Sequence, residues 1–178
     1  FEHIDVPPTL VSFAVSTAKA DKIISAEFKL PYSKILYIAP EYDENKLPKF
    51  DSVKKVFEKV EKEIASGNAL SVWSVANGGA AEGIFKMSLG NRIGAKLENL
   101  SDDKLFTPCY GAFVIEAKEA FDGAEVIGET VEDYTITCGD TVIDIAALEK
   151  KWNTVLEPVF KNTLKEMPAP AVIEYKEG

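Results

Sequence analysis

Short apolar runs bounded by proline or glycine recur along this chain, and they limit its fold more than any other feature. Runs of this length predict buried strands, because they are too short and too uniformly apolar for surface helices. The strands expected on this basis are Thr9–Val15, Lys34–Ala39, Ala69–Val75, Ile93–Leu97, Tyr110–Glu116 and Glu125–Gly128. Tyr134–Cys138 and Thr141–Ile145 flank Gly139-Asp140, the pattern of a β-hairpin.

Three stretches instead carry the spacing of helices. The first opens at Asp51 and ends at Gly67, with lysines and glutamates on a solvated face opposite its apolar residues. The second is expected over Ala80–Leu89, and a last helix should begin after Asp144 or Ile145. The residues expected to face the core are Val53, Val56, Phe57, Val60, Ile64, Ile84, Phe85, Leu89, Leu148, Trp152, Val155, Leu156 and Val159.

The order of these elements predicts the fold class. Strands and helices do not alternate regularly, so we expect an α+β fold, an α/β sandwich whose mixed, mostly antiparallel sheet has packed helices. The chain has 178 residues, enough for one domain without staples. We place that domain at residues 5–160 and a linker or tail at residues 161–178, with a polar loop at Glu98–Asp103.

Charge excludes some classes of function. A formal net charge of −9 repels phosphate backbones, so we expect no nucleic-acid partner. No apolar run reaches the roughly 20 residues of a membrane span, so we expect no membrane contact. Phe1–Asp5 lack the basic and apolar regions of a signal peptide, which favours a cytoplasmic protein.

Cysteine and histidine usage narrows the chemistry further. Cys109 and Cys138 have no metal-ligand spacing, and buried reduced thiols are favoured over a disulfide. The single histidine, His3, lies at the N-terminus, where a catalytic base would be poorly held. The acidic pairs Asp102-Asp103 and Glu132-Asp133 fit solvated loops better than a shared acid–base site. We therefore name no catalytic residue and no metal ligand.

One turn has the properties of a binding site. Asn77, Gly78 and Gly79 lie between an apolar strand and a helix, where free amides and the helix dipole favour a phosphate or carboxylate. Glu82 follows in the first turn, placed to oppose an anion or to accept from a sugar hydroxyl. The pattern is neither a nucleotide P-loop nor a dinucleotide fingerprint, and taken alone it favours a purely structural tight turn over a binding site.

Ser71–Ile84 together with Lys86–Gly94 resembles the C-terminal domain shared by aminoimidazole ribonucleotide synthase and its relatives. The run from Met87 to Gly94 is most similar to the long bacterial phosphoribosylformylglycinamidine synthases. Four other segments fit the same domain: Pro7–Val15, Ile24–Lys29, Tyr110–Val114 and Ile127–Thr130.

This resemblance implies one domain of a larger ligase of purine biosynthesis. Such enzymes convert formylglycinamide ribonucleotide to the amidine with ATP and glutamine. The implied partners are an ATP-binding half, a glutaminase domain and the ribonucleotide; ATP and magnesium belong to the whole enzyme, with no cofactor on this fragment. The isolated fragment is expected to be inactive.

The family loop reads His-Asp-x-Ser-Asp-Gly-Gly, and it helps to hold the phosphate end of the substrate. Here only Gly78 and Gly79 are kept, and Asn77 stands for the acid. We therefore predict a substrate phosphate site at Asn77, Gly78, Gly79 and Glu82, and the resemblance supports no polar role at Trp73, Ser74 or Ala76. The alternative is a freestanding, non-catalytic binding or scaffold module with a structural turn.

Overall fold

The computed structural model describes residues 5, 7–98, 100–159 and 161. His3 and most of the expected tail lie outside the described residues. The helices are η1 (Ala20–Lys22, a short 3-10 helix), α1 (Phe50–Ser66), α2 (Gly79–Leu89), α3 (Asp102–Phe106) and α4 (Ile145–Thr154). The strands are β1 (Lys34–Ile38), β2 (Ala69–Ser74), β3 (Gly94–Leu97), β4 (Phe113–Ala117), β5 (Glu125–Val131), β6 (Thr135–Cys138) and β7 (Thr141–Asp144).

The described strands form one seven-stranded sheet in the order β2-β4-β1-β5-β3-β6-β7. The β3–β6 pair is parallel, and the other neighbouring pairs are antiparallel. Because β1 and β2 both pair antiparallel with β4, they run in the same direction, and their C-termini lie at the same end of the sheet. The expected mixed, mostly antiparallel α+β fold is therefore confirmed.

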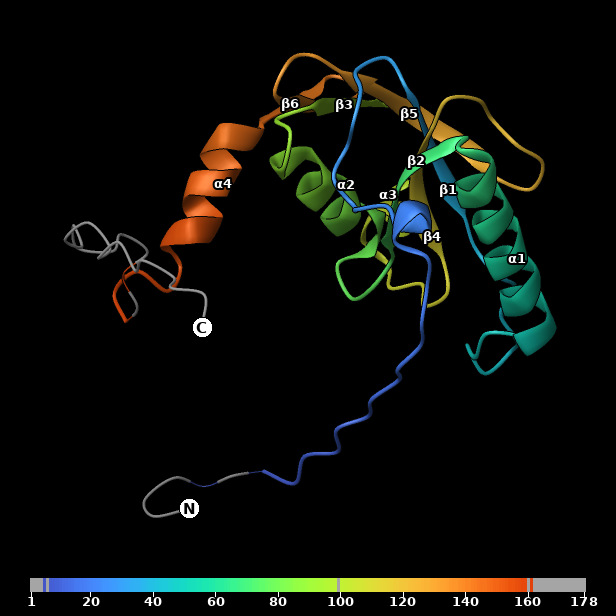
Figure 1. Ribbon diagram of the computed structural model, residues 1–178. Helices are drawn as coiled ribbons and strands as arrows, with labels where there is room; N and C mark the ends of the chain where they lie inside the picture. Colours follow the sequence, from blue (N-terminus) through green and yellow to red (C-terminus); the bar gives the residue numbers. More distant parts are fainter. Residues whose placement is uncertain (1–4, 6, 99, 160, 162–178) are drawn as a thin grey trace, which may run out of the picture.

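Strand β1 shows how the sheet separates two cores. Successive side chains of a strand point to opposite faces. Leu36 and Ile38 accordingly pack with Val56 and Val60 of α1, on one face. Ile35 and Tyr37 join the core under α2 on the other face. Figure 1 shows α1 and α2 on opposite sides of the sheet.

The helices expected from Asp51 to Gly67 and over Ala80–Leu89 are confirmed as α1 and α2. Asp51 lies in the first turn of α1, where a carboxylate complements the helix dipole. Gly67 ends α1 in the left-handed conformation, at φ +74°. Helix α4 begins where expected, because the side chain of Asp144 accepts a 2.9 Å hydrogen bond from the amide of Ala146. The predicted hairpin is also confirmed, as β6 and β7.

The expectation for Thr9–Val15 was wrong within the described structure. This segment is extended but belongs to no strand, and Phe13 is 87% exposed. From Leu10 to Ala18 it makes no hydrogen bond with any described residue. The apolar run predicts burial, but a strand also needs a partner edge, which the described chain does not supply.

The expected inner face of the last helix was also wrong. Trp152, Val155, Leu156 and Val159 are exposed, and Leu148 is at the boundary of exposure. Trp152 contacts Phe85 edge to face at 6.2 Å, so it lies at the margin of the core rather than inside it. The helix extends beyond α2, away from most of the sheet (Figure 1), so most of its apolar stripe has no described surface to cover it.

Two smaller expectations need adjustment. The polar loop expected over Glu98–Asp103 ends early, because α3 begins at Asp102 and buries Leu105 against α2. On α1, Val56 and Val60 are buried as expected, but Phe57 remains half exposed. No helix among the described residues combines the length and apolarity that crossing a membrane requires.

Candidate functional site

Three connections meet at the end of the sheet where the C-termini of β1 and β2 lie. Ile38 at the end of β1 and Ser74 at the end of β2 are both in register with Phe113 of β4. The turn Asn77–Gly79 follows β2, the loop with Tyr42 follows β1, and Cys109–Gly111 leads into β4. Residues far apart in the sequence therefore gather at this end.

The four residues predicted to hold phosphate lie together at the start of α2. Asn77 is exposed, Gly78 and Glu82 are half-buried, and Gly79 is buried. The Gly78 amide donates a 3.0 Å hydrogen bond to Oε2 of Glu82, and the Gly79 amide donates to the carbonyl of Ala76 at 3.1 Å. Both glycine amides thus have partners within the chain.

Glu82 is held by a cation as well as by the turn. Nζ of Lys86, one helical turn further on, lies 2.7 Å from Oε1 of Glu82. This lysine, followed by the Gly78 amide, holds the pKa of Glu82 below its usual range. At neutral pH the corner therefore contains a carboxylate with its own counterion.

Close packing explains the two glycines. Gly79 has φ +66°, and a Cβ there would overlap the main-chain carbonyl of Leu105 in α3. A Cβ on Gly78 would come within 2.5 Å of the Glu82 Cβ. Gly79 allows α2 to begin directly against α3, and Gly78 leaves room for the Glu82 side chain, so both glycines have structural roles in the turn.

Trp73, which the resemblance of the sequence aligns with the family histidine, packs beside the turn. A Cβ on Gly83 would lie 2.7 Å from the Trp73 ring, and Nζ of Lys86 lies 5.4 Å from the ring centroid. The buried indole Nε1 has no hydrogen-bond partner among the described residues. Trp73 thus shapes the wall behind Glu82 and Lys86.

A hollow of about 480 Å³ lies beside the turn. Its walls come from β1, the loop after β1, α3 and the approach to β4; the lining residues are Tyr37, Tyr42, Lys46, Asp103, Lys104, Thr107, Pro108, Cys109 and Tyr110. The Tyr110 hydroxyl donates to Oδ1 of Asn77 at 2.5 Å, and the Tyr42 hydroxyl donates to the carbonyl of Tyr110 at 2.7 Å. We call this hollow the tyrosine pocket; Asn77 joins it to the glycine turn.

The phenols of Tyr37 and Tyr42 in the tyrosine pocket are neutral at physiological pH. Burial, together with the Cys109 thiol, raises the pKa of Tyr42 to about 12. The same two causes, burial first, raise the pKa of Tyr37 above its ordinary range. The pocket therefore offers phenol rings and hydroxyls, and Lys46, Asp103 and Lys104 add charged side chains to its lining.

Sequence reasoning missed this pocket. Tyr42 and Tyr110 are 68 residues apart and no local pattern links them, so only the pairing of β1 with β4 brings them together. Cys109 lines the tyrosine pocket and Cys138 lines a separate apolar hollow. Both thiols are free, and each is half-buried rather than buried as expected.

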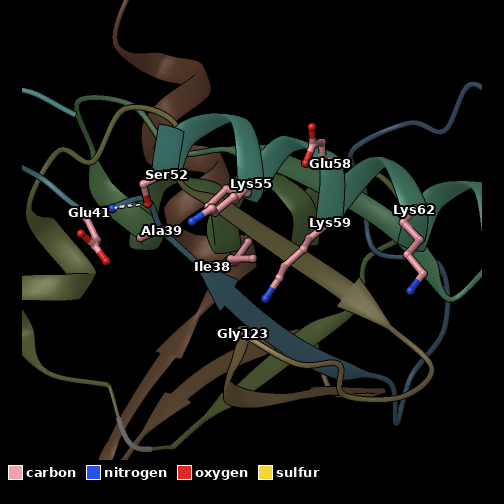
Figure 2. Close-up of a pocket in the computed structure, with 10 residues that line it drawn as sticks. Ile38, Ala39, Glu41, Ser52, Lys55, Glu58, Lys59, Lys62 and Gly123 are labelled. Carbon is pink, nitrogen blue, oxygen red and sulfur yellow. Dashed lines mark hydrogen bonds between the residues drawn. The ribbon is translucent and has the colours of Figure 1, made fainter. Parts of the chain in front are cut away.

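A third hollow, of about 440 Å³, lies along α1 (Figure 2). Lys55, Lys59 and Lys62 extend over it from the helix, opposite Gly123. Nζ of Lys59 is bound to the carbonyl and carboxylate of Asp122, at 3.0 and 3.1 Å. The amines stand on the charged face expected from the sequence, which lies largely in solvent.

Comparison with known proteins gives a clear result for structure only. No family model matches the chain, and no curated protein matches it in sequence. Solved structures do match. Phosphoribosylformylglycinamidine synthase II of Thermotoga maritima aligns with 90% of this chain at a TM-score of 0.60 and 14% identity. T. maritima PurL complexed with FGAR aligns with 89% at 0.58 and 12%, and T. maritima PurLQS with 90% at 0.62 and 12%.

The chain has the fold of a PurL domain. At 12–14% identity the likeness establishes the fold and nothing finer. The chain spans 30–33% of the length of these PurL chains, so it corresponds to about one third of such a protein. The PurL fold agrees with the family resemblance of the sequence.

Proposed function

We propose that this chain is one domain of a phosphoribosylformylglycinamidine synthase, a cytoplasmic ligase that forms a carbon–nitrogen bond using ATP and glutamine. The observation that carries the proposal is the PurL fold over 90% of the chain, reached independently of the resemblance at the glycine turn. The domain would occupy residues 5–160. Its partners would be the ATP-binding half and the glutaminase domain of the same enzyme.

The family resemblance implies that ATP and magnesium belong to the ATP-binding half of the whole enzyme. Among the described residues, no three Asp, Glu, His or Cys side chains converge on a point that could hold a cation. We therefore name no magnesium ligand among the described residues.

The role proposed for the turn is to hold the phosphate of formylglycinamide ribonucleotide. Because Oδ1 of Asn77 is occupied by Tyr110, its Nδ2 is left to donate to a phosphate oxygen. The Gly78 amide can donate to phosphate only if the Glu82 carboxylate leaves it. In this proposal Glu82 turns away as phosphate binds, and Lys86 neutralises the added charge.

Binding of formylglycinamide ribonucleotide to the whole synthase, measured by calorimetry, tests this role. Asn77→Ala should weaken binding about 10-fold, the value of one hydrogen bond to a charged group. Glu82→Gln removes the competing charge and should tighten binding several-fold, whereas Glu58→Gln on the exposed face of α1 should change nothing. Unchanged affinity in both Asn77→Ala and Glu82→Gln would contradict phosphate binding at this turn.

A second candidate is the non-catalytic binding or scaffold module. The observation in its favour is that both glycine amides have partners inside the chain and that Leu105 packs directly against Gly79. Such a module should be a stable monomer with a polar surface. Sedimentation of the chain with a dye for exposed apolar surface separates the two functions, since a synthase domain should bind the dye.

A further inference from the structure

The stretch Pro7–Thr17 is apolar, uncharged and uncovered. Leu10, Phe13 and Val15 are 96, 87 and 94% exposed. No charged residue interrupts the stretch, although 28% of the whole chain is charged. Uncharged segments with β-branched and aromatic residues associate readily, so this stretch needs a cover in the working protein.

The alternation of side chains along this segment indicates the kind of surface that would bury it. In an extended chain Thr9, Val11, Phe13 and Val15 point to one side, and Leu10, Ser12 and Ala14 point to the other. The first side carries the larger apolar groups, and the second carries Leu10 and Ala14 with one small hydroxyl between them. Neither side is charged, which fits a strand that is covered on both faces. The main chain from Leu10 to Ala18 makes no hydrogen bond with a described residue, so its donors and acceptors are open to an adjacent strand.

The described sheet does not accept the segment. Its open edges are β2 and β7, since every other described strand has two neighbours. The segment leaves the body near Ala18, which lines a hollow with Phe57 and Val72, and from there it runs outward, away from both edges (Figure 1). The acceptor edge thus lies outside the described chain.

We propose that Thr9–Val15 is a donor strand that completes a sheet in a neighbouring domain of the same synthase polypeptide. Main-chain hydrogen bonds to an open edge would hold it, and Val11, Phe13 and Val15 would enter the core of that domain. This inference rests on the proposed function.

Two observations favour a neighbouring domain over a second copy of the chain. The PurL chains with this fold are about three times as long as the matched region, so other parts of the same polypeptide lie beside it in those proteins. A strand tethered to its acceptor has a high effective concentration. A second copy would instead bring together two chains that each carry a charge of −9.

Hydrogen–deuterium exchange tests the strand. The amides of Thr9–Val15 are compared in this 178-residue chain alone and in the whole synthase that contains it. We expect fast exchange in the chain alone and exchange at least ~100-fold slower in the synthase. Equal, fast exchange in both would overturn the proposal.

Three variants separate pairing from packing. In the synthase, Ser12→Pro removes an amide donor and Phe13→Asp places a charge in the proposed core; each should lower protection of the segment at least ~10-fold. Val142→Asp, on the exposed open edge β7, is the matched control and should leave the segment protected. In the chain alone, all three should leave the thermal transition of the folded body in place. Full protection in both segment variants overturns the proposal.

Other occupants give distinct results. Protection in the chain alone that rises with protein concentration indicates pairing between copies, and protection independent of concentration indicates folding back onto the chain's own sheet; either result overturns the proposal. Glutamine-dependent turnover of formylglycinamide ribonucleotide reports separately on the proposed function. A synthase that turns over with an unprotected segment contradicts the strand alone, whereas a protected segment without turnover contradicts the function alone.

Discussion

The side chain of Glu116 on β4 accepts a 2.8 Å hydrogen bond from the main-chain amide of Lys29, 87 residues earlier in the chain. The same carboxyl group accepts from the Leu30 amide and from the Ser71 hydroxyl, each at 2.9 Å. Glu116 is fully buried. One acidic side chain thus fixes the segment before β1 against β2 and β4, because it satisfies donors that have no strand to pair with.

Removing this acceptor should strongly destabilise the fold. Glu116→Ala leaves one buried and two part-buried donors unpaired, and we expect a loss of about 3–5 kcal/mol in the free energy of unfolding in urea. Glu129→Ala, on an exposed strand position, is the control and should cost less than about 1 kcal/mol. A small loss for Glu116→Ala would mean that water replaces the carboxyl group.

Gly79 and Gly67 should respond differently to alanine. Both have positive φ, at +66° and +74°, but a Cβ at Gly67 meets no atom within 4 Å, whereas one at Gly79 overlaps the Leu105 carbonyl. We expect Gly67→Ala to cost about 1 kcal/mol and Gly79→Ala about 3 kcal/mol, measured by thermal unfolding. Equal costs would show that α3 can move away from the turn.

Tyr42 should make stability depend on alkaline pH. Its pKa rises from 10.0 to about 12 on folding, so the folded state keeps a proton that the unfolded state loses. The stability from this group is complete below pH 10 and is lost as the pH rises from 10 toward 12. Tyr42→Phe should flatten the unfolding free energy over that range, whereas Tyr32→Phe, an exposed tyrosine, should not.

Glu27 should make the stability of the fold depend on pH in the acid range. Lys29 first, then Ser25, lower its pKa from 4.5 to about 2, through contacts of 2.5 and 2.6 Å with Oε1. The stability from this group is therefore present above pH 4.5 and is lost as the pH falls toward 2. Because these side chains are 27–34% exposed, solvent screening limits the contribution to about 1 kcal/mol.

Urea unfolding between pH 2 and 6 checks this contribution. Glu27→Gln should reduce the dependence of the unfolding free energy on pH in this range, and 1 M salt should reduce that of the unsubstituted protein. A pH dependence that is identical in both proteins would contradict the assignment to Glu27.

The four residues of the glycine corner lie within one strand–turn–helix connection, so their proximity could be predicted from sequence alone. The partners of the corner could not. Lys86 is one helical turn from Glu82, but its choice of that carboxylate, like the overlap of Leu105 with Gly79, depends on how α2 packs. The tyrosine pocket could not be predicted from the sequence, because it forms only when β1 pairs with β4.

Local physics accounts for what the sequence determined by itself. The apolar spacing of α1, the glycine that ends it, the cap at Asp144 and the hairpin between β6 and β7 all depend on neighbours in the chain. The tertiary structure determined which apolar residues are buried. Val56 and Val60 pack against the sheet, whereas Phe13 and Val155 remain exposed. The reason is that periodicity specifies the face that should be buried but not the partner that buries it.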